Sequence, residues 1–174
     1  MVGEAGADPR GTGKGRQHGT CRRQGVLRRD QRREGAPLIV VDASVIVAIL
    51  GRESDGASFA ERLESTPRGP GLRSASTVTL WEAASAVARL HPVTRKRAFE
   101  LVTNFCGLSE IRPIAPDMAI TALAVEAAQR YGMGPGYPGI LNLGDCFSYA
   151  TARHLGAALL FKGDDFRRTD IAVA

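Results

Sequence analysis

From Leu38 onward the chain alternates between short apolar runs and longer stretches in which apolar side chains recur every three or four residues. Short runs rich in β-branched residues are typical of buried parallel strands, and the longer spacing is typical of amphipathic helices. The runs predict strands at 38–41, 72–75, 110–114 and 158–161, with 171–173 as a candidate fifth. The helical pattern predicts helices at 43–50, from Ser54 onward, and at 77–90, 94–105, 117–131 and 143–155.

Strands that alternate with helices build α/β proteins whose parallel sheet is covered on both faces. We therefore expect an α/β fold, a three-layer α/β/α sandwich with a mostly parallel four- to five-stranded sheet. In such sheets ligands sit beyond the carboxyl ends of the strands. Residues 132–139 contain four glycines and two prolines, which predicts a flexible loop before the last helix.

Residues 1–37 are rich in Gly and Arg and hold nine basic and four acidic side chains. The net charge of +5 therefore belongs to this segment, and fourteen charges of each sign remain in residues 38–174. Such a segment buries too little apolar surface to offset its ordering entropy. We expect 1–37 to be a disordered basic extension, or one translated from an upstream start that the cell does not use, and 38–174 to be the folded domain. A basic arm that touches RNA is the alternative.

The three cysteines, Cys21, Cys106 and Cys146, are odd in number and widely spaced. This argues against a disulfide framework and against a zinc site. The longest apolar run, 45–50, is too short to span a bilayer, and the N-terminus lacks the apolar core of a signal peptide. We therefore expect a reduced, cytoplasmic protein without membrane contact.

Acidic residues stand at positions that a packed helix–sheet core does not require. They are Asp42 at the end of the first strand, Glu82 within an apolar helix, Asp145 at the start of the helix 143–155, and Asp164 with Asp165 after the fourth strand. Strand ends and the helix starts beside them meet at one edge of a parallel sheet, so we expect these carboxylates to share a site.

Crowded carboxylates repel one another, and a divalent cation relieves that repulsion. Hard oxygen ligands suit Mg²⁺ or Mn²⁺, and such a metal activates water and neutralises charge on a phosphodiester. Taken singly, Asp42 and Asp145 have helix capping as an alternative role, and Asp164 and Asp165 have turn formation. Glu82 is harder to explain this way, because a buried unpaired carboxylate is costly.

The stretch IVVDASVIVAIL (39–50) resembles the opening of PIN domains, and LWEAASAV (80–87) is similar to their second acidic helix. LNLGDCFSYATARHLG (141–156) resembles the third motif of VapC toxins, and LLFKGDDFRRTDI (159–171) resembles a closing segment of one VapC subgroup. The resemblance covers 38–174 with four motifs in order. It implies a PIN-like nuclease domain that acts as a metal-dependent endoribonuclease, the toxin of a toxin–antitoxin pair.

The resemblance also implies roles for the acids. Asp42 and Asp145 would be direct metal ligands, and Glu82 would be a ligand or act through a metal-bound water. Asp164 would complete the catalytic and metal-binding set. Ser44 matches a frequent family hydroxyl that bonds a ligand or a metal water, with an ordinary helix-start serine as the alternative.

The fourth acid departs from the common family pattern. Many PIN domains carry Thr-x-Asp at the end of the fourth strand, and this chain has Phe161 and Gly163 at those places. The fourth acid is therefore Asp164 or Asp165, and Asp164 is the prediction.

The resemblance implies three partners: an RNA substrate, a second copy in a homodimer, and a cognate VapB-like antitoxin whose C-terminal segment covers the acidic groove. Phe59 and Leu63 are candidate contacts for the two protein partners. The basic run 95–97 is interpreted as a solvated helix face, with RNA phosphate contact as the alternative. Phosphate contact is left open for Lys162, Arg167 and Arg168, and Trp81 is interpreted as a core or interface residue.

The same acidic residues can be weighed against four other functions. A PIN-type RNA-processing nuclease outside a toxin operon would use the same acids. A non-catalytic Mg²⁺-binding signalling module of the receiver type needs paired acids at the first strand end, where Val41 precedes Asp42. A phosphatase of the haloacid dehalogenase type needs Asp-x-Asp, and Ser44 takes the second place. A pure interaction protein would not require the full acidic set.

Overall fold

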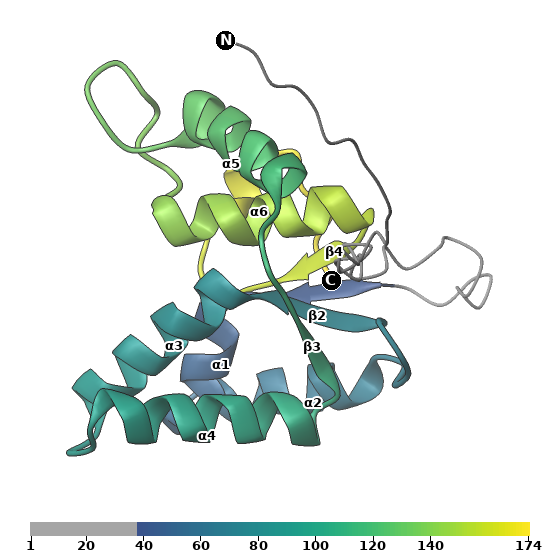
Figure 1. Cartoon of the computed structure of the whole chain (residues 1–174), viewed down its shortest axis with the longest axis vertical. Helices are drawn as coiled ribbons and strands as arrows, with labels where there is room; N and C mark the ends of the chain where they lie inside the picture. The colour runs from purple at the N-terminus through teal and green to yellow at the C-terminus, as the bar shows by residue number, and fades with distance from the viewer. Residues whose placement is uncertain (1–37) are drawn as a thin grey trace, which may run out of the picture. The chain divides into compact units, whose positions relative to one another are not determined.

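The computed structural model describes residues 38–174, in which a parallel sheet lies between two layers of helices (Figure 1). The prediction of disorder for 1–37 lies outside these residues. The strands are β1 (Ile39–Val41), β2 (Arg73–Ser76), β3 (Ile111–Ile114) and β4 (Ala158–Leu160). The helices are α1 (Ala43–Leu50), α2 (Gly56–Ser65), α3 (Thr77–Leu90), α4 (Arg95–Leu108), α5 (Met118–Tyr131), α6 (Leu143–Leu155) and the short 3-10 helix η2 (Phe166–Arg168).

The sheet has the order β3-β2-β1-β4, and each pair of neighbouring strands is parallel. Val40 in the central strand pairs with Ser74 on one side and with Leu159 on the other. All carboxyl ends therefore lie at one edge, on the left in Figure 1, where α1, α3 and α6 begin.

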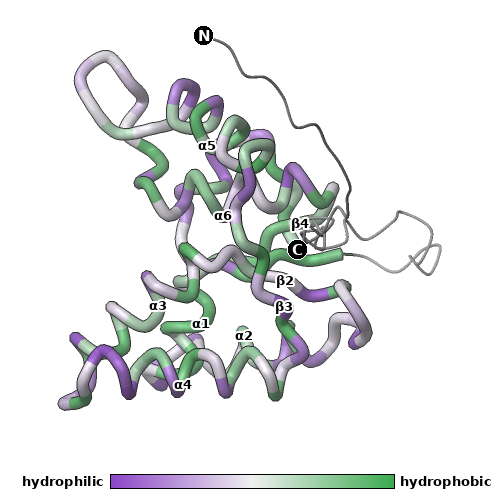
Figure 2. Tube along the Cα trace, in the orientation of Figure 1, coloured by the Kyte–Doolittle hydropathy of each residue, from purple (hydrophilic) through white to green (hydrophobic). Residues whose placement is uncertain are grey.

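Alternation along β1 divides the core into two parts. Ile39 and Val41 pack among the apolar side chains of α1 to α4, whereas Val40 packs among those of α5 and α6. In Figure 1 these two layers lie below and above the sheet, and Figure 2 shows the hydrophobic colour of β1 between them. The period of two along a strand is what allows one strand to serve both layers.

The second strand is buried but mostly polar, with the sequence Arg-Ser-Ala-Ser. Arg73 is 0% exposed, and its Nη1 donates to the carbonyl of Ser109 at 2.9 Å while Nη2 donates to that of Thr66. Those residues are the C-caps of α4 and α2. Helix C-termini carry partial negative charge, so they stabilise a buried cation.

The candidate fifth strand is reduced to a bridge. Val173 pairs with Leu159 in parallel, held by hydrogen bonds from the Leu159 N–H to the Ala172 carbonyl and from the Ala174 N–H to the Leu159 carbonyl. Within residues 38–174 the sheet therefore has the lower of the two predicted strand numbers. No helix in this part of the chain is long and apolar enough to cross a membrane.

Candidate active site

Three of the predicted acids approach one another at the carboxyl edge of the sheet. Asp42 directly follows β1, Glu82 lies in the second turn of α3, and Asp145 lies in the first turn of α6. Their charges act on one another: Asp42 and Asp145 both raise the pKa of Glu82, and Asp42 raises that of Asp145. Residues 40 to 103 positions apart in the sequence are thus gathered by the parallel topology.

Asp42 is held rigidly and is only 4% exposed. Its Oδ2 accepts hydrogen bonds from the backbone N–H of Ser44 at 2.9 Å and from the Ser44 hydroxyl at 2.6 Å. Its Oδ1 accepts from the Ser148 hydroxyl at 2.7 Å. Asp42 therefore is the N-cap of α1, but capping uses one oxygen only, and the other is bound by α6.

Hydroxyl groups on two helices tie Asp42 to its surroundings. Ser148 lies one turn after Asp145 in α6 and shares a 3.0 Å hydrogen bond with Thr79, which lies one turn before Glu82 in α3. Sequence reasoning missed both hydroxyls, although a spacing of three residues from each acid placed them on the same helix faces.

Glu82 lies directly against the backbone of α6. A Cβ built on Gly144 would meet the Glu82 carboxylate at 1.8 to 1.9 Å, so a side chain at that position excludes the observed placement of Glu82. Gly144 is a second residue that sequence reasoning missed. The available signal was a glycine inside a helix, where it lowers stability relative to alanine and calls for a packing reason.

Burial and like charge raise two of the pKa values in the site. Desolvation is the largest cause for Glu82 and, with the charges of Asp42 and Asp145, raises its pKa to about 7. Desolvation also raises the pKa of Asp145 to about 6, against a backbone hydrogen bond from Asn142 that lowers it, and the charges of Asp42 and Asp165 raise it further. Neither carboxyl gains a compensating cation from residues 38–174.

The capping role of Asp145 is real but secondary. Asn142 is the N-cap of α6, and its Oδ1 accepts from the Asp145 N–H at 3.0 Å while Asp145 Oδ2 accepts from the Asn142 N–H at 2.8 Å. This reciprocal pair is a capping box. It holds Asp145 by one oxygen, as Ser44 holds Asp42.

The structure separates the two candidates for the fourth acid. The side chain of Asp164 is 90% exposed and pairs with Arg167 at 3.5 Å across the turn that leads into η2. The charge of Asp165, by contrast, reaches Asp145 and raises its pKa. The charge of Asp165 thus acts on the acidic site, while Asp164 as the fourth acid stays a prediction.

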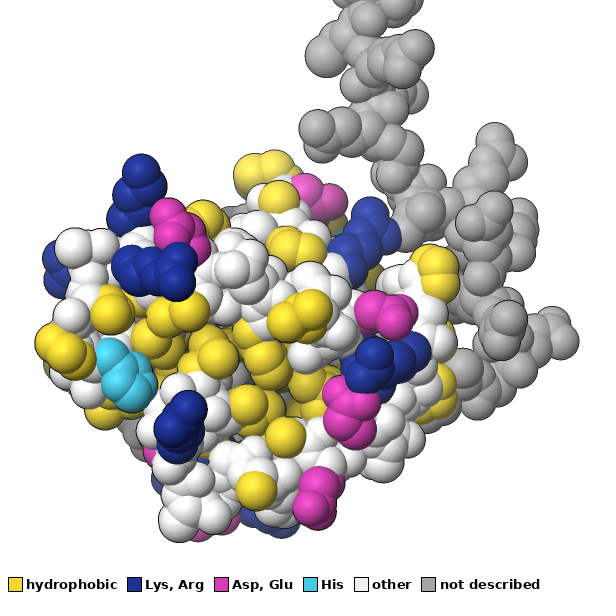
Figure 3. Space-filling view, turned by 90° about the horizontal axis from the view of Figure 1, so that it is seen from below, with side chains coloured by type: hydrophobic (Ala, Val, Ile, Leu, Met, Phe, Trp, Pro, Cys, Tyr) yellow, Lys and Arg dark blue, Asp and Glu magenta, His cyan; other side chains and the backbone are white. Residues whose placement is uncertain are grey.

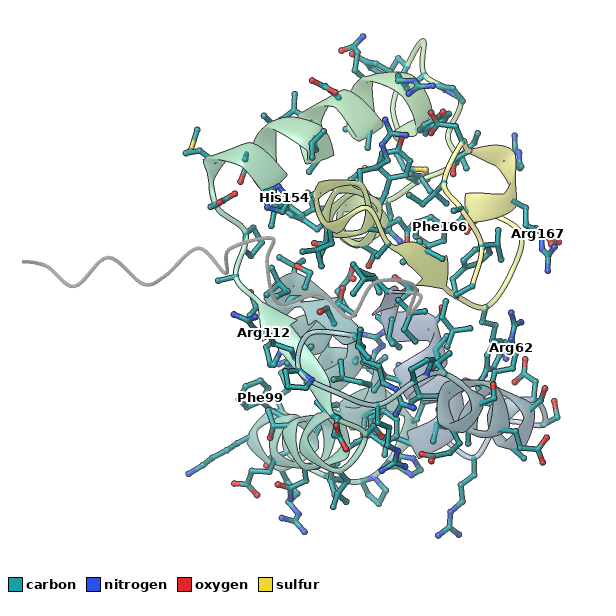
Figure 4. All side chains as sticks on the ribbon, turned by 90° about the vertical axis from the view of Figure 1, so that its right-hand side faces the viewer. Arg62, Phe99, Arg112, His154, Phe166 and Arg167 are labelled. Carbon is teal, nitrogen blue, oxygen red and sulfur yellow. The ribbon has the colours of Figure 1, made fainter. Side chains whose placement is uncertain are left out.

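Of the three cations after β4, Lys162 and Arg167 pair with acidic side chains, whereas Arg168 is exposed and has no ion pair within residues 38–174. The Lys162 ammonium pairs with Glu53 and, at 2.9 Å, with Asp55, and its backbone N–H donates to the Ser44 hydroxyl at 3.0 Å. Arg167 is exposed on η2, beside the buried Phe166 (Figure 4). The backbone of Lys162 thus holds the segment after β4 against Ser44, while its ammonium pairs with acids other than Asp42, Glu82 and Asp145.

The donor set suits a hard divalent cation. Asp42, Glu82, Asp145 and Asp165 offer only carboxylate oxygens, and their mutual repulsion is what such an ion relieves. In residues 38–174 no three His, Cys, Asp or Glu side chains lie close enough together to hold a metal ion by themselves. Mg²⁺ commonly keeps several waters and takes only one or two carboxylates directly, so the open arrangement fits water-bridged coordination.

Trp81 fits only one of the two roles that the sequence predicted for it, core or interface. Trp81, next to Glu82 on α3, is 67% exposed and so is not a core residue among residues 38–174. Its exposure leaves the interface interpretation.

Comparison with known proteins agrees with the sequence motifs. The PIN domain family model matches residues 39–172. A VapC ribonuclease of Rhizobium meliloti is 36% identical over 141 residues, covering 75% of this chain and 97% of that protein. Ribonuclease VapC42 of Mycobacterium tuberculosis is 37% identical over 136 residues, covering 78% of this chain and 98% of that protein.

The fold has a counterpart among solved structures. The crystal structure of Mycobacterium tuberculosis VapC20, described as a sarcin–ricin loop cleaving toxin, superposes with a TM-score of 0.62 at 17% identity. The match covers 78% of this chain and 98% of that one, and it shows a shared fold. With the family match and the relatives above 30% identity, the chain belongs to the VapC family of PIN-domain proteins.

Proposed function

We propose that this chain is a metal-dependent endoribonuclease that acts as the toxin of a toxin–antitoxin pair. The observation that carries the proposal is the crowding of Asp42, Glu82 and Asp145 at one sheet edge, with two raised pKa values and no compensating cation among residues 38–174. The relatives named VapC ribonuclease support RNA as the substrate. The RNA target of the VapC20 toxin is not carried over, because that similarity concerns the fold.

The side chains divide the work. Asp42 and Asp145 would hold the metal, Glu82 would hold it or its water, and Asp165 would complete the set in preference to Asp164. Ser44 and Ser148 orient Asp42 through the hydrogen bonds described above. A bound Mg²⁺ or Mn²⁺ supplies an activated water and neutralises charge on the scissile phosphate.

The test is RNA cleavage by the purified full-length chain. We expect cleavage with Mg²⁺ or Mn²⁺, its loss in excess EDTA, and products with 5′-phosphate and 3′-hydroxyl ends. An Asp145→Asn preparation made in parallel controls for contaminating ribonucleases. Cleavage that persists in EDTA, or products with cyclic phosphate ends, contradicts a metal-activated water.

The protein partners follow from the same proposal: a homodimer and a VapB-like antitoxin. Leu63 was expected to be one of the contacts, and that prediction is wrong, because Leu63 is 1% exposed and packs inside the lower core. Phe59 is only half-buried, and Figure 3 shows apolar side chains across the middle of the face formed by the lower helices. Co-expression with the neighbouring reading frame, followed by light scattering, tests both partners; a monomer that copurifies with no antitoxin argues against the toxin role.

A further inference from the structure

Cations without an acidic partner gather where α3 connects to α4. Among the residues that the structure describes, Arg89, Arg95 and Lys96 are exposed and form no ion pair, while the neighbouring Arg97 pairs with Glu100 at 2.9 Å. Figure 3 shows dark-blue side chains around the left end of the lower face, where the two helices connect. These four basic and one acidic side chains give the α3–α4 tip (residues 89–100) a net charge of +3 within a domain that is neutral as a whole.

Helix stability does not account for this cluster. Arg95, Lys96 and Arg97 occupy the first turn of α4, which contains no acidic residue. The N-terminus of a helix carries partial positive charge, so cations there are unfavourable and acids are preferred. Arg89 differs, because it lies in the last turn of α3, where a cation suits the dipole. A local rule broken without compensation is expected at functional sites.

Helix α3 joins this tip to the acidic site. Glu82 and Arg89 are seven residues apart, which is two helical turns, so they share a face and are separated by about 10 Å along the axis. Ser85, which lies between them in the sequence, is half-buried, and Trp81 beside Glu82 is exposed. In Figure 1, α3 leaves the carboxyl edge of the sheet and runs outward to the lower left, where it meets α4.

We propose that the α3–α4 tip binds the phosphate backbone of the RNA strand whose scissile bond lies at the acidic site. The proposal rests on the proposed function. The acids repel phosphates, so the chain needs a separate basic surface to hold the strand, and the tip is the part of residues 38–174 where unpaired cations cluster. Arg89, Arg95 and Lys96 contact phosphates two turns beyond Glu82 and contribute affinity without reading sequence.

The experiment measures binding apart from cleavage. A labelled single-stranded RNA is titrated in EDTA against the full chain and against Arg89→Gln/Arg95→Gln/Lys96→Gln, over a range of salt concentrations. Each lost phosphate contact lowers the salt slope by about 0.7 for single strands, so we expect a fall of about 2 and an affinity at least about tenfold weaker at low salt. With metal, KM for RNA rises while kcat at saturation stays the same.

A matched control comes from the edge strand. Arg112 on β3 is exposed, has no ion pair within the described residues and points outward from the sheet (Figure 4). Arg112→Gln removes the same charge and group as Arg89→Gln, and we expect it to change the salt slope much less. Melting temperatures of the tip variants should be unchanged or slightly higher, because cations leave the N-terminus of α4.

Two outcomes overturn the proposal in distinguishable ways. If the wild-type chain cleaves RNA and the triple variant binds with the same affinity and salt slope, the tip does not hold the substrate, as would be the case if it docked an acidic protein segment. If the wild-type chain cleaves no RNA with Mg²⁺ or Mn²⁺, the proposed function fails and the tip proposal fails with it.

Discussion

The two ends of the parallel sheet both bury charge, but they treat it in opposite ways. At the amino end, Arg73 is fully buried and donates to the carbonyls that end α2 and α4. At the carboxyl end, Glu82 and Asp145 are partly buried beside Asp42, and their charges act against one another. The amino end places a cation against the negative ends of two helix dipoles, whereas the carboxyl end places several acids beside one another.

The difference separates a scaffold from a site. A buried charge costs free energy unless partners compensate it, and Arg73 finds compensation inside the chain for two of its three nitrogens, Nε being the exception. Glu82 has no such compensating partner within residues 38–174, so its charge destabilises the carboxyl end until a bound cation supplies positive charge. Uncompensated like charge at a strand edge is thus the physical mark of a site for a cation.

The largest expected effect lies at the carboxyl end. Asp42→Asn and Asp145→Asn keep the caps, because Asn caps about as well as Asp, but lose the charge that holds a metal. A metal contributes several kcal/mol to the transition state, so we expect cleavage to fall at least about a hundredfold, with the metal-free melting temperature unchanged or raised.

Asp117→Asn is the control for those variants, because Asp117 caps α5 with its Oδ1 and lies outside the acidic site. Its cleavage should match the wild type. Full metal-dependent cleavage by Asp42→Asn or Asp145→Asn would show that the carboxyl end of the sheet is not the metal site.

The second effect tests the amino end. Arg73→Met leaves the carbonyls of Thr66 and Ser109 without their donor, and each unsatisfied group costs about 1–3 kcal/mol. We expect thermal or urea unfolding to show a loss of about 2–5 kcal/mol, with cleavage per folded molecule unchanged. Arg112→Met on the exposed edge should change stability by less than about 0.5 kcal/mol. Folded Arg73→Met that cleaves as poorly as Asp145→Asn would show that the amino end also serves the reaction.

The third effect concerns the contact between α6 and Glu82. Gly144→Ala places a methyl group where the Glu82 carboxylate lies, and the flexible acid moves aside. We expect cleavage to fall about tenfold while stability changes little. Gly107→Ala in α4, where an added Cβ meets nothing, is the control and should leave cleavage intact. In a Glu82→Gln background Gly144→Ala should add less loss than it does alone, and equal losses would contradict the contact.

The fourth effect is the dependence of metal-free stability on pH. The pKa of Glu82 rises from 4.5 to about 7 on folding, so the folded chain binds more protons than the unfolded chain between these values. Stability from this group is therefore fully present below pH 4.5 and is lost as pH rises to 7. We expect Glu82→Gln to be more stable than the wild type at pH 8, by on the order of 1–3 kcal/mol, and to differ much less at pH 4.

Melting curves of both proteins at the two pH values, in EDTA, make that measurement. Added Mg²⁺ should raise the melting temperature of the wild type at pH 8 more than that of Glu82→Gln. Equal melting temperatures of the two proteins at pH 8 would mean that the ionised Glu82 carboxylate does not destabilise the fold.

The smallest effect distinguishes the adjacent acids after β4. Asp165→Asn should reduce cleavage several-fold, because the Asp165 charge acts on Asp145, by roughly 1 kcal/mol of transition-state stabilisation. Asp164→Asn should change cleavage by less than about twofold, because Asp164 faces solvent beside Arg167. The reverse order would restore Asp164 as the fourth acid.

Local signals in the sequence determined much of the secondary structure. The helices at 43–50, 77–90 and 143–155 were predicted with the bounds that the structure has, because caps, glycines and prolines act within a few residues. The helix predicted from residue 117 likewise begins there, because the Asp117 side chain accepts from the Ile120 N–H as the N-cap of α5. The acids Asp42, Glu82 and Asp145 were found because they interrupt apolar patterns.

Contacts between distant segments were decided only by the tertiary structure. The burial of Leu63, the exposure of Trp81 and the different surroundings of Asp164 and Asp165 depend on how elements pack, and no local pattern encodes them. Ser148, Thr79 and Gly144 gain their roles from contacts between α3, α6 and the end of β1. The sequence by itself determined which residues form each element and which acids a packed core does not require, because propensity and periodicity are local. Packing alone decided which charges are compensated, because compensation needs groups that only the folded sheet brings together.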